Sequence, residues 1–586
     1  MLLAAALLVT ACAGGDGADG GGAAEPPDSD QNGTEQNSAD QDDADHDAEA
    51  EREQRLQELA EEYDAALAGP AEQHTAEAAE YVADMTVEQQ AGQVLIGEYE
   101  GTDAAAAAQL IEDLHLAGII LMGHNIPGGT DDVDTAALSE QIETISAAGG
   151  SDEAEERAAA PIISVDQEGG LVTRVGAPLT EWPTPMAYGA AAAADPEQGA
   201  QLARAGHRGM AEELYDLGFT VSFAPTADVT LGATDPTIGS RAFGGDESSV
   251  SDLTRQSIRG LAEGGLAGSV KHFPGHGSVT EDSHYTLPVQ DASIEELRER
   301  DWVPFAEAID AGAPMVMMGH IEVPALEPGM PSSLSAAAYD ELRQMGHEGV
   351  IVTDAMNMGA IADGYGGDQA VVQALSAGAD LLLMPASVPG ARDAIVEAVE
   401  SGQVPQDRLA EAAERVVALS LWHQDLAAGD LAAGPGAEIA EDLAGELGRL
   451  DAAAAQTAEQ AAAAAVTLVH GTCESAAVEE AIQIAGGSEQ DRARLAAAAE
   501  RAGVETGWGT TVTLLGGSVP GSGEAVVALD RPEVLADSAA ETKIALYGRT
   551  PESFDALMEV LTGGEAPGAL PVAAGEDGIG HSACAD

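Results

Sequence analysis

The chain has 586 residues, with 102 Asp and Glu against 23 Lys and Arg, which gives a formal net charge of −79. Such an acidic chain repels the phosphates of nucleic acids and the headgroups of anionic lipids, so we expect neither as a direct partner. The length allows two to four domains, and hydrophobic residues at 45% are enough for a large core. The acidity is typical of a salt-rich habitat or of a compositionally biased genome, and both explanations stay open.

The N-terminus carries a targeting pattern. Residues 2–11 read LLAAALLVTA, an apolar run that is too short for a bilayer, which needs about 20 residues. The sequence VTAC that ends at Cys12 resembles a bacterial lipobox, whose cysteine is acylated; a chance apolar N-terminus is the alternative. We expect a lipoprotein signal peptide over 1–12 and a lipid anchor at Cys12. The protein would then lie on the extracellular face of the cell membrane, or be secreted if the anchor is absent.

The segment after Cys12 has the composition of a tether. Residues 13–50 are rich in Gly, Asp, Asn and Ser and contain almost nothing to bury, which predicts disorder. Residues 51–90 mix acidic and apolar residues and indicate helix. We therefore assign 13–75 to a disordered acidic tether and a leading helix.

From residue 93 onward, eight short apolar runs recur, separated by helix-like stretches. Each run is nearly continuous in apolarity, as expected of strands that are buried on both faces of a parallel sheet. Eight strand–helix units predict an α/β fold, a (β/α)8 barrel over 76–425, with an open doubly wound sheet as the alternative. The runs are Val94–Glu98, Gly118–Met122, Ile162–Asp166, Thr220–Ala224, Gly268–His272, Met315–Gly319, Val350–Asp354 and Asp380–Met384. Helical periodicity lies between them at Glu197–Leu217, Ser251–Gly264 and Ser293–Ala311.

Polar residues stand at the carboxyl ends of several runs. The third run ends in Asp166, the fifth in Lys271 and His272, and the seventh in Asp354, while His320 follows the sixth. In a barrel these ends form the mouth that carries the active site. Burying a charge inside the barrel would cost several kcal/mol, so we expect these side chains at the mouth.

The densest motif follows the fifth run, where KHFPGHG at 271–277 is followed by DSH at 282–284. Further motifs are VDQEGG at 165–170 with Arg174, FAPTADV at 223–229, GSRAFG at 239–244 and VTDAM at 352–356. With these motifs in this order, the chain resembles glycoside hydrolase family 3, and within it the NagZ-type β-N-acetylhexosaminidases in their bacterial lipoprotein form. The resemblance spans about residues 80–420 and depends most on the KHFPGHG and DSH motifs.

This resemblance implies a retaining double displacement. Asp354 is then the nucleophile that attacks the anomeric carbon; a helix N-cap ahead of Ala355 is the structural alternative. His284 is implied as the acid/base, with Asp282 two residues earlier to orient its ring. Histidine titrates at about 6.5 when unperturbed, so it can give and then take a proton.

Five other residues match family positions that hold the hydroxyls of the non-reducing sugar. They are Asp166, Arg174, Arg241, Lys271 and His272. Charge-assisted hydrogen bonds from such groups orient a sugar as well as bind it. For Arg174 and Arg241, an ion pair that closes the barrel mouth is the alternative. The role of His276 is open, and one interpretation is that it serves only to shape the loop. His320 lies near the sugar site by topology and could equally be a satisfied strand-end histidine. We expect no metal or other cofactor, because the histidines and cysteines lack ligand spacings.

The C-terminal part indicates a second domain. Residues 426–440 predict a linker, and 441–586 predict a small, sandwich-like α/β domain that begins with an Ala-rich helix. Its strand-like runs are Val466–His470, Thr511–Leu515, Ala525–Leu529 and Ile544–Tyr547. It resembles the second domain of longer family members, and we expect a structural role because the DSH loop would supply the acid/base. Cys473 and Cys584 could pair in an exported protein, and two free thiols are the alternative.

Together these features predict an exported enzyme that removes non-reducing terminal β-N-acetylglucosamine from peptidoglycan- or chitin-derived oligosaccharides or muropeptides. A β-N-acetylglucosaminide phosphorylase and a β-glucosidase are alternatives within the family. A surface lipoprotein that only binds glycan is the non-enzymatic alternative. Such a decayed site would be expected to lose Asp354, His284 or Asp282, and all three are present. We expect a monomer.

Overall fold

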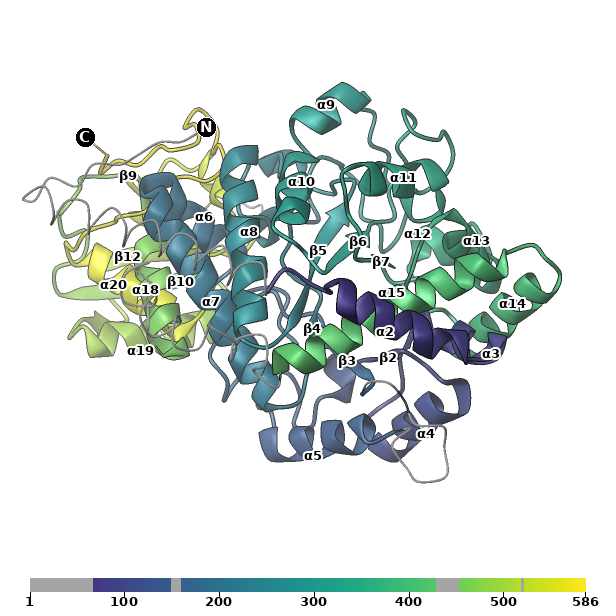
Figure 1. Ribbon diagram of the computed structural model, residues 1–586. Helices are drawn as coiled ribbons and strands as arrows, with labels where there is room; N and C mark the ends of the chain where they lie inside the picture. Colours follow the sequence, from purple (N-terminus) through teal and green to yellow (C-terminus); the bar gives the residue numbers. More distant parts are fainter. Residues whose placement is uncertain (1–66, 149–156, 158–159, 428–452, 518–520, 586) are drawn as a thin grey trace, which may run out of the picture. The chain divides into compact units, whose positions relative to one another are not determined.

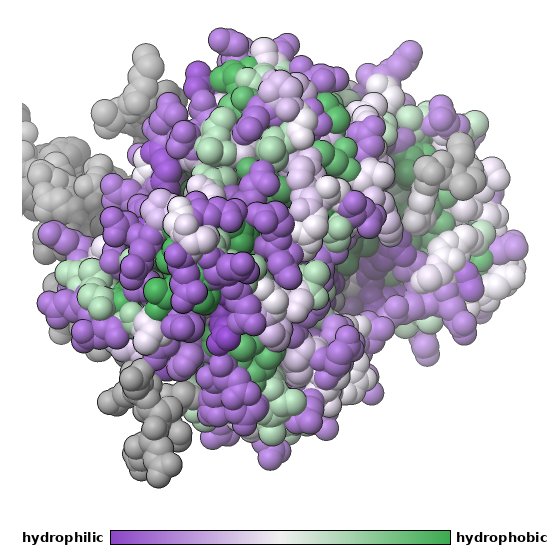
Figure 2. Space-filling model, turned by 90° about the vertical axis from the view of Figure 1, so that its right-hand side faces the viewer, coloured by the Kyte–Doolittle hydropathy of each residue, from purple (hydrophilic) through white to green (hydrophobic). Residues whose placement is uncertain are grey.

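The computed structural model describes residues 67–148, 157, 160–427, 453–517 and 521–585. The predicted signal peptide with Cys12, most of the tether and residues 428–440 of the predicted linker lie outside the described residues. The described residues belong to one compact unit, and hydrophilic residues cover most of the face shown in Figure 2. Within these ranges, no helix combines the length and apolarity needed to cross a membrane.

Eight parallel strands form a barrel, as predicted (Figure 1). Neighbouring strands pair in chain order from β1 to β7, and β8 pairs with β1. The ring closes where Val352 bridges to Leu381 and the amide of Thr353 donates to the carbonyl of Leu381 at 3.0 Å. The strands are β1 (Leu95–Gly97), β2 (Gly118–Ile120), β3 (Ile162–Val165), β4 (Val221–Ser222), β5 (Ala267–Phe273), β6 (Met315–Met318), β7 (Val350–Thr353) and β8 (Leu382–Leu383).

Each of these strands is buried along its whole length, and its side chains alternate between two clusters. Ile119 and Ile351 pack in the cluster that contains most of the surrounding helices, whereas Ile120 and Val352 pack mainly with residues of other strands. Successive side chains of a strand point to opposite faces. Burial on both faces therefore explains the continuous apolar runs in the sequence.

Helices follow the strands around the barrel. Of the helices predicted from periodicity, two match α7 and α8, and α8 begins earlier than predicted because the Asp246 side chain accepts from the amide of Ser249 at 2.9 Å. The single helix predicted over Ser293–Ala311 is wrong: it breaks into α9 and α10, where Pro304 lies in the first turn of α10 and has no N–H for a continuing helix. The helices of this part are α2 (Glu72–Ala83), α3 (Val87–Gln93), α4 (Ala104–Leu114), α5 (Thr135–Ser146), α6 (Pro185–Ala194), α7 (Pro196–Asp216), α8 (Glu247–Glu263), α9 (Ile294–Glu299), α10 (Val303–Asp310), α11 (Ala336–Gln344), α12 (Gly359–Ala362), α13 (Gly367–Ala377), α14 (Val388–Glu400) and α15 (Gln406–Ala427).

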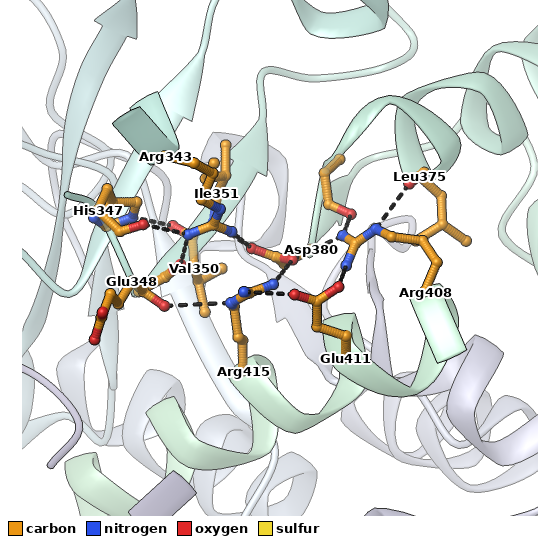
Figure 3. A network of polar contacts seen from close by, with 12 residues as sticks. Arg343, His347, Glu348, Val350, Ile351, Leu375, Asp380, Arg408, Glu411 and Arg415 are labelled. Carbon is orange, nitrogen blue, oxygen red and sulfur yellow. Dashed lines mark hydrogen bonds and ion pairs between the residues drawn. The ribbon is translucent and has the colours of Figure 1, made fainter. Parts of the chain in front are cut away.

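A charged network ties the amino-terminal end of the barrel together (Figure 3). Asp380, just before β8, is fully buried and contacts Arg343, Arg408 at 2.8 Å and Arg415 at 3.1 Å, and it accepts from the amide of Ile351 at 3.0 Å. Burial alone would raise the pKa of this carboxyl, but the three guanidiniums outweigh burial and hold the pKa below its usual value. Because barrel enzymes carry their chemistry at the opposite end, this network serves stability.

The C-terminal domain is a six-stranded sheet in the order β11-β10-β12-β13-β14-β9, with β9 antiparallel to β14. All four predicted strands are present. The apolar pattern of the sequence does not indicate β10 or β11. Part of β10 is exposed and a polar residue interrupts its apolar run, and β11 is exposed throughout and has no apolar run. Cys473 and Cys584 form a disulfide, so the first of the two alternatives holds. The elements are α18 (Ala454–Ala465), β9 (Thr467–His470), β10 (Ala481–Gly486), α19 (Glu489–Arg501), β11 (Glu505–Thr506), β12 (Thr510–Leu515), β13 (Ala525–Ala528), β14 (Thr542–Ala545) and α20 (Pro551–Leu561).

A barrel helix covers one face of this second sheet. Helix α6 reads PMAYGAAAAA and is buried almost throughout, as expected of a helix that is apolar all round. Its Met186 and Ala190 pack in one cluster with Val526 of β13 and Ala545 of β14. The other face of the sheet packs against α19 and α20, through residues such as Leu557. The core of the C-terminal domain is therefore partly made of barrel residues.

Candidate active site

Four of the predicted sugar-binding residues meet at the mouth of the barrel, around a fifth residue that was not predicted. Lys271 Nζ lies 2.7 Å from Glu168 Oε1 and 3.0 Å from Asp166 Oδ1. Arg241 donates from Nε and Nη2 to the two carboxylate oxygens of Glu168, each at 2.8 Å. Arg174 Nη2 lies 4.0 Å from Asp166 Oδ2. Arg241 thus forms a buried ion pair with Glu168, and its role as a sugar-binding residue stays a prediction.

Burial and pairing together set the charges of this cluster. Glu168 is 1% exposed and Lys271 is 2% exposed. Burial alone would raise the pKa of Glu168, but Arg241 and Lys271 outweigh it and hold the pKa well below its usual value. Burial alone would lower the pKa of Lys271, and Glu168 and Asp166 raise it instead. Both groups are thus charged at neutral pH, while Asp166 and Arg174 are partly exposed at the edge of the cluster.

His272 is held by a second residue that was not predicted, Asp228. The ring Nδ1 of His272 lies 2.8 Å from Asp228 Oδ2, and Asp228 Oδ1 accepts from the amides of His272 at 3.3 Å and His276 at 2.6 Å. Because a carboxylate only accepts, Nδ1 carries the proton and Nε2 is the nitrogen available to a ligand. The ring of His276 is buried with Nε2 3.0 Å from Ser283 Oγ, so His276 shapes the loop, as one interpretation of the sequence had it.

Asp354 follows β7 directly at the barrel mouth. Its amide donates to the carbonyl of Met318 on β6 at 2.8 Å, and its Oδ1 accepts from the amide of Ala355 at 2.8 Å. The side chain is half-buried. Burial alone would raise its pKa, but His320, His272 and the amide of Ala355 outweigh burial and lower it, which keeps the carboxylate ionised. The helix N-cap alternative is wrong, because the next helix, α12, begins only at Gly359.

His320 supports the turn after Asp354. Its Nε2 lies 3.0 Å from the carbonyl of Ala355 and its Nδ1 lies 2.7 Å from Ser333 Oγ, and the ring is fully buried. The carbonyl can only accept, so Nε2 carries the proton. Burial lowers the pKa of His320. It is therefore a satisfied strand-end histidine, which was one of the two alternatives.

His284 and Asp282 lie on the loop after β5 and contact each other. Asp282 Oδ1 lies 2.8 Å from His284 Nδ1 and accepts from the amide of His284 at 2.9 Å. Since Nδ1 donates to the carboxylate, Nε2 is left for proton exchange. Burial alone would raise the pKa of Asp282, but the amide and ring of His284 outweigh burial and lower it. The side chain of His284 is 60% exposed, so Nε2 is open to an incoming substrate.

The loop is seated on the segment that follows Asp354. The amide of Gly359 donates to the carbonyl of His284 at 3.1 Å, and the amide of Ala360 donates to that of Ser283 at 3.3 Å. A Cβ at position 359 would lie 2.9 Å from the carbonyl oxygen of His284 and 3.1 Å from that of Tyr285. This close contact between the loop and the segment therefore requires a glycine at position 359. It brings His284 to the part of the mouth that contains Asp354.

Comparison with known proteins identifies similar sequences and structures. Residues 86–419 match the glycosyl hydrolase family 3 N terminal domain. A beta-hexosaminidase of Stenotrophomonas maltophilia (strain R551-3) is 38% identical over 274 residues, which cover 46% of this chain and 76% of that protein. Beta-hexosaminidase A of Pseudoalteromonas piscicida is 29% identical over 337 residues, 53% of this chain and 54% of that protein, so the chain spans about half the length of this relative. The structure of a glycoside hydrolase family 3 beta-N-acetylglucosaminidase from Paenibacillus sp. str. FPU-7 has a TM-score of 0.69 and 26% identity, covering 84% of this chain and 99% of that one.

Proposed function

The chain belongs to glycosyl hydrolase family 3, and on that premise we propose that it is a β-N-acetylhexosaminidase that removes terminal β-N-acetylglucosamine with retention of configuration. One observation carries the proposal. The loop with His284 and Asp282 is held by hydrogen bonds on the segment that follows Asp354. This contact supports a mechanism in which a nucleophile and a proton donor act at one sugar. The relatives named as beta-hexosaminidases support the choice of sugar.

In the first step, a carboxylate oxygen of Asp354 attacks the anomeric carbon while the bond to the leaving oxygen breaks. The proton on His284 Nε2 passes to that oxygen, so the leaving group departs as an alcohol. Asp282, bound to Nδ1, holds the ring in one orientation during the transfer. The product of this step is a glycosyl ester on Asp354.

In the second step, the neutral Nε2 of His284 takes a proton from water, and the water oxygen attacks the anomeric carbon. The ester bond breaks, and Asp354 leaves as a carboxylate. Two inversions give net retention. The ionised state of Asp354, which its lowered pKa secures, suits both the attack and the departure.

The cluster around Glu168 is suited to hold the sugar during both steps. Asp166 and Arg174 are partly exposed and offer charged hydrogen-bonding groups to hydroxyls, and the Nε2 of His272 is free for a third contact. Lys271 and Arg241 lie deeper, where Glu168 fixes their positions. Groups that are already positioned lose little freedom when substrate binds.

We further propose that the enzyme is exported and lipid-anchored at Cys12, and that it acts on peptidoglycan- or chitin-derived oligosaccharides. The disulfide between Cys473 and Cys584 supports an oxidising compartment, independently of the N-terminal pattern.

The test is turnover of p-nitrophenyl β-N-acetylglucosaminide by the full chain and by Asp354→Asn. We expect a loss of about a thousandfold or more in the variant, because the nucleophile is removed. Asp363→Asn is the matched control, since Asp363 is an exposed carboxylate nine residues later. An Asp354→Asn variant as active as this control would contradict the proposal.

The same substrate separates the family's alternatives. Added phosphate should leave the product as free N-acetylglucosamine; a sugar 1-phosphate would show a phosphorylase instead. Faster release from the corresponding glucoside than from the N-acetyl sugar would show a β-glucosidase.

A further inference from the structure

Tyr285, the residue after His284, exposes its aromatic ring to an unusual degree for this protein. It is 76% exposed, the highest value among the large hydrophobic residues that the structure describes. Tyr188, Tyr339 and Tyr547 are almost fully buried instead. Aromatic side chains carry a large apolar surface, so leaving one in water forgoes a substantial gain from burial. Single exposed aromatic residues are common, so the feature that makes Tyr285 a candidate for a function is its place directly after His284.

The backbone that carries this ring is fixed. The amides of Tyr285 and Thr286 both donate to the carbonyl of Asp282 at 3.0 Å. On the other side, the carbonyl of His284 accepts from the amide of Gly359. The ring is thus exposed on a turn held at several points, and this is the arrangement that a preformed binding surface requires.

The mechanism places the leaving group beside Tyr285. The proton on His284 Nε2 must reach the oxygen that links the terminal sugar to the rest of the substrate. The group on the far side of that oxygen therefore lies next to the loop that carries His284 and Tyr285. In a β-linked N-acetylglucosamine all ring substituents are equatorial, so each face of the ring presents axial C–H groups, a flat apolar surface that matches an aromatic face.

We propose that Tyr285 is a stacking platform for the first sugar of the leaving group, so that the site selects saccharide leaving groups over small alcohols. This inference rests on the proposed function, because it takes its geometry from the proton transfer to the leaving oxygen. The ligand class is a pyranose of the N-acetylglucosamine type.

The experiment compares hydrolysis of N,N′-diacetylchitobiose, whose leaving group is a sugar, with that of methyl β-N-acetylglucosaminide, whose leaving group is methanol. The readout is the ratio of the two kcat/KM values. We expect Tyr285→Ala to lower this ratio about tenfold, the usual scale of a lost aromatic contact, and Tyr285→Phe to keep it. Trp508→Ala is the control: Trp508 is also an exposed aromatic residue, at 53%, but it lies between β11 and β12 of the C-terminal domain.

An unchanged ratio in Tyr285→Ala would overturn the inference, even if both rates fell together. Equal losses for the two substrates would mean that the ring only supports the conformation of the loop. Absence of hydrolysis of both substrates by the unmodified protein would count against the proposed function. The platform is then tested by binding in the Asp354→Asn background. Calorimetry should show tighter binding of diacetylchitobiose than of the methyl glycoside, and Tyr285→Ala should remove that preference; equal affinities before the substitution would overturn the inference.

Discussion

The carboxylate of Glu168 determines the charge balance of the barrel mouth at the scale of single residues. It is the common partner of Lys271 and Arg241, and all three side chains are largely buried. Removing one member of a buried ion pair leaves an uncompensated charge, which costs more than the pair contributed. The predicted sugar-binding cations thus depend on a residue that touches no sugar in the proposed mechanism.

Replacement Glu168→Gln should therefore lower the free energy of unfolding by about 3–5 kcal/mol, because Lys271 and Arg241 lose their buried counter-charge. The KM for the N-acetyl sugar should rise as these cations shift. Urea unfolding at neutral pH and steady-state kinetics check the two effects. Glu295→Gln, an exposed carboxylate in the first turn of α9, is the control. A variant as stable as this control would contradict the role assigned to Glu168.

We expect the folded protein to lose stability in mild acid because of three buried histidines. Burial lowers the pKa of His207, His347 and His423 to about 4 in each case, from an ordinary value of 6.5. Between these values the unfolded chain binds more protons than the folded one, so the free energy of unfolding falls as the pH falls from 6.5 towards 4. Well above pH 6.5 all three are neutral in both states and contribute nothing to this effect.

His423→Gln should flatten this pH dependence, because a glutamine amide can still donate to the carbonyl of Gly265, which His423 Nε2 contacts at 3.0 Å, but never takes up a proton. The slope of the unfolding free energy should decrease by up to about 1.4 kcal/mol per pH unit. Urea titrations at a series of pH values between 7 and 4 measure it. Identical slopes for the variant and the unmodified protein would show that His423 does not contribute.

The loop after β5 and the short helix α12 form one functional unit at the scale of elements. The loop carries His284 and Asp282, the proposed acid/base pair, and the first two amides of α12 donate to its carbonyls. Position 359 has room for a hydrogen atom only, because the carbonyls of His284 and Tyr285 approach it closely. The separation between the proposed nucleophile and the proposed proton donor therefore depends on a glycine that takes no part in the proposed chemistry.

Gly359→Ala should reduce kcat by about a hundredfold, since a methyl group there displaces the loop and small misplacements of reacting groups are costly. Stability should fall by only about 1–2 kcal/mol, because the change disturbs no more than the two hydrogen bonds that hold the loop on α12. Gly364→Ala is the matched control: its Cβ would meet only the carbonyl of Ala360, at 3.9 Å. Steady-state kinetics and thermal unfolding measure the two effects. A variant with unchanged kcat would show that the contact between the loop and α12 does not position His284.

Elements and motifs differ in how far the sequence predicts them. All eight barrel strands were predictable, because burial on both faces leaves a continuous apolar run such as Val350–Thr353. Strand β11 was not, because its residues Glu505 and Thr506 are exposed and carry no apolar pattern. The position of α6 against the second sheet was also unpredictable, since an apolar helix shows that it is buried but not by what.

The same limit applies to the candidate site. Asp354, His284 and Asp282 stand in distinctive motifs, and the sequence predicts them as site residues. Glu168 and Asp228 stand in motifs too, but their importance comes from contacts with residues 73 and 44 positions away. Such contacts depend on the order of strands around the barrel and on side-chain directions, which periodicity does not reveal.

The charge of the whole molecule bears on which oligosaccharides it accepts. A net charge of −79 gives the molecule a negative long-range potential. Leaving groups with carboxylates, as in muropeptides, are then repelled, whereas neutral chitin fragments are not. Salt weakens this repulsion, because the screening length falls from about 30 Å at 0.01 M to about 8 Å at 0.15 M.

We therefore expect kcat/KM for a muropeptide substrate to rise severalfold between 0.01 and 0.15 M salt, while the value for diacetylchitobiose stays nearly constant. The neutral substrate is the control for any effect of salt on the enzyme itself. A parallel rise for both substrates would indicate salt-dependent folding rather than repulsion of the substrate.

The second sheet can cover helix α6 only long after the helix has been synthesised. Met186 and Ala190 are synthesised more than 300 residues before Val526 and Ala545, the residues that bury them. At translation rates of about 5–20 residues per second, this apolar helix has no permanent neighbour on that side for tens of seconds. The growing chain must therefore keep α6 from associating with other chains until β13 and β14 have emerged and cover it.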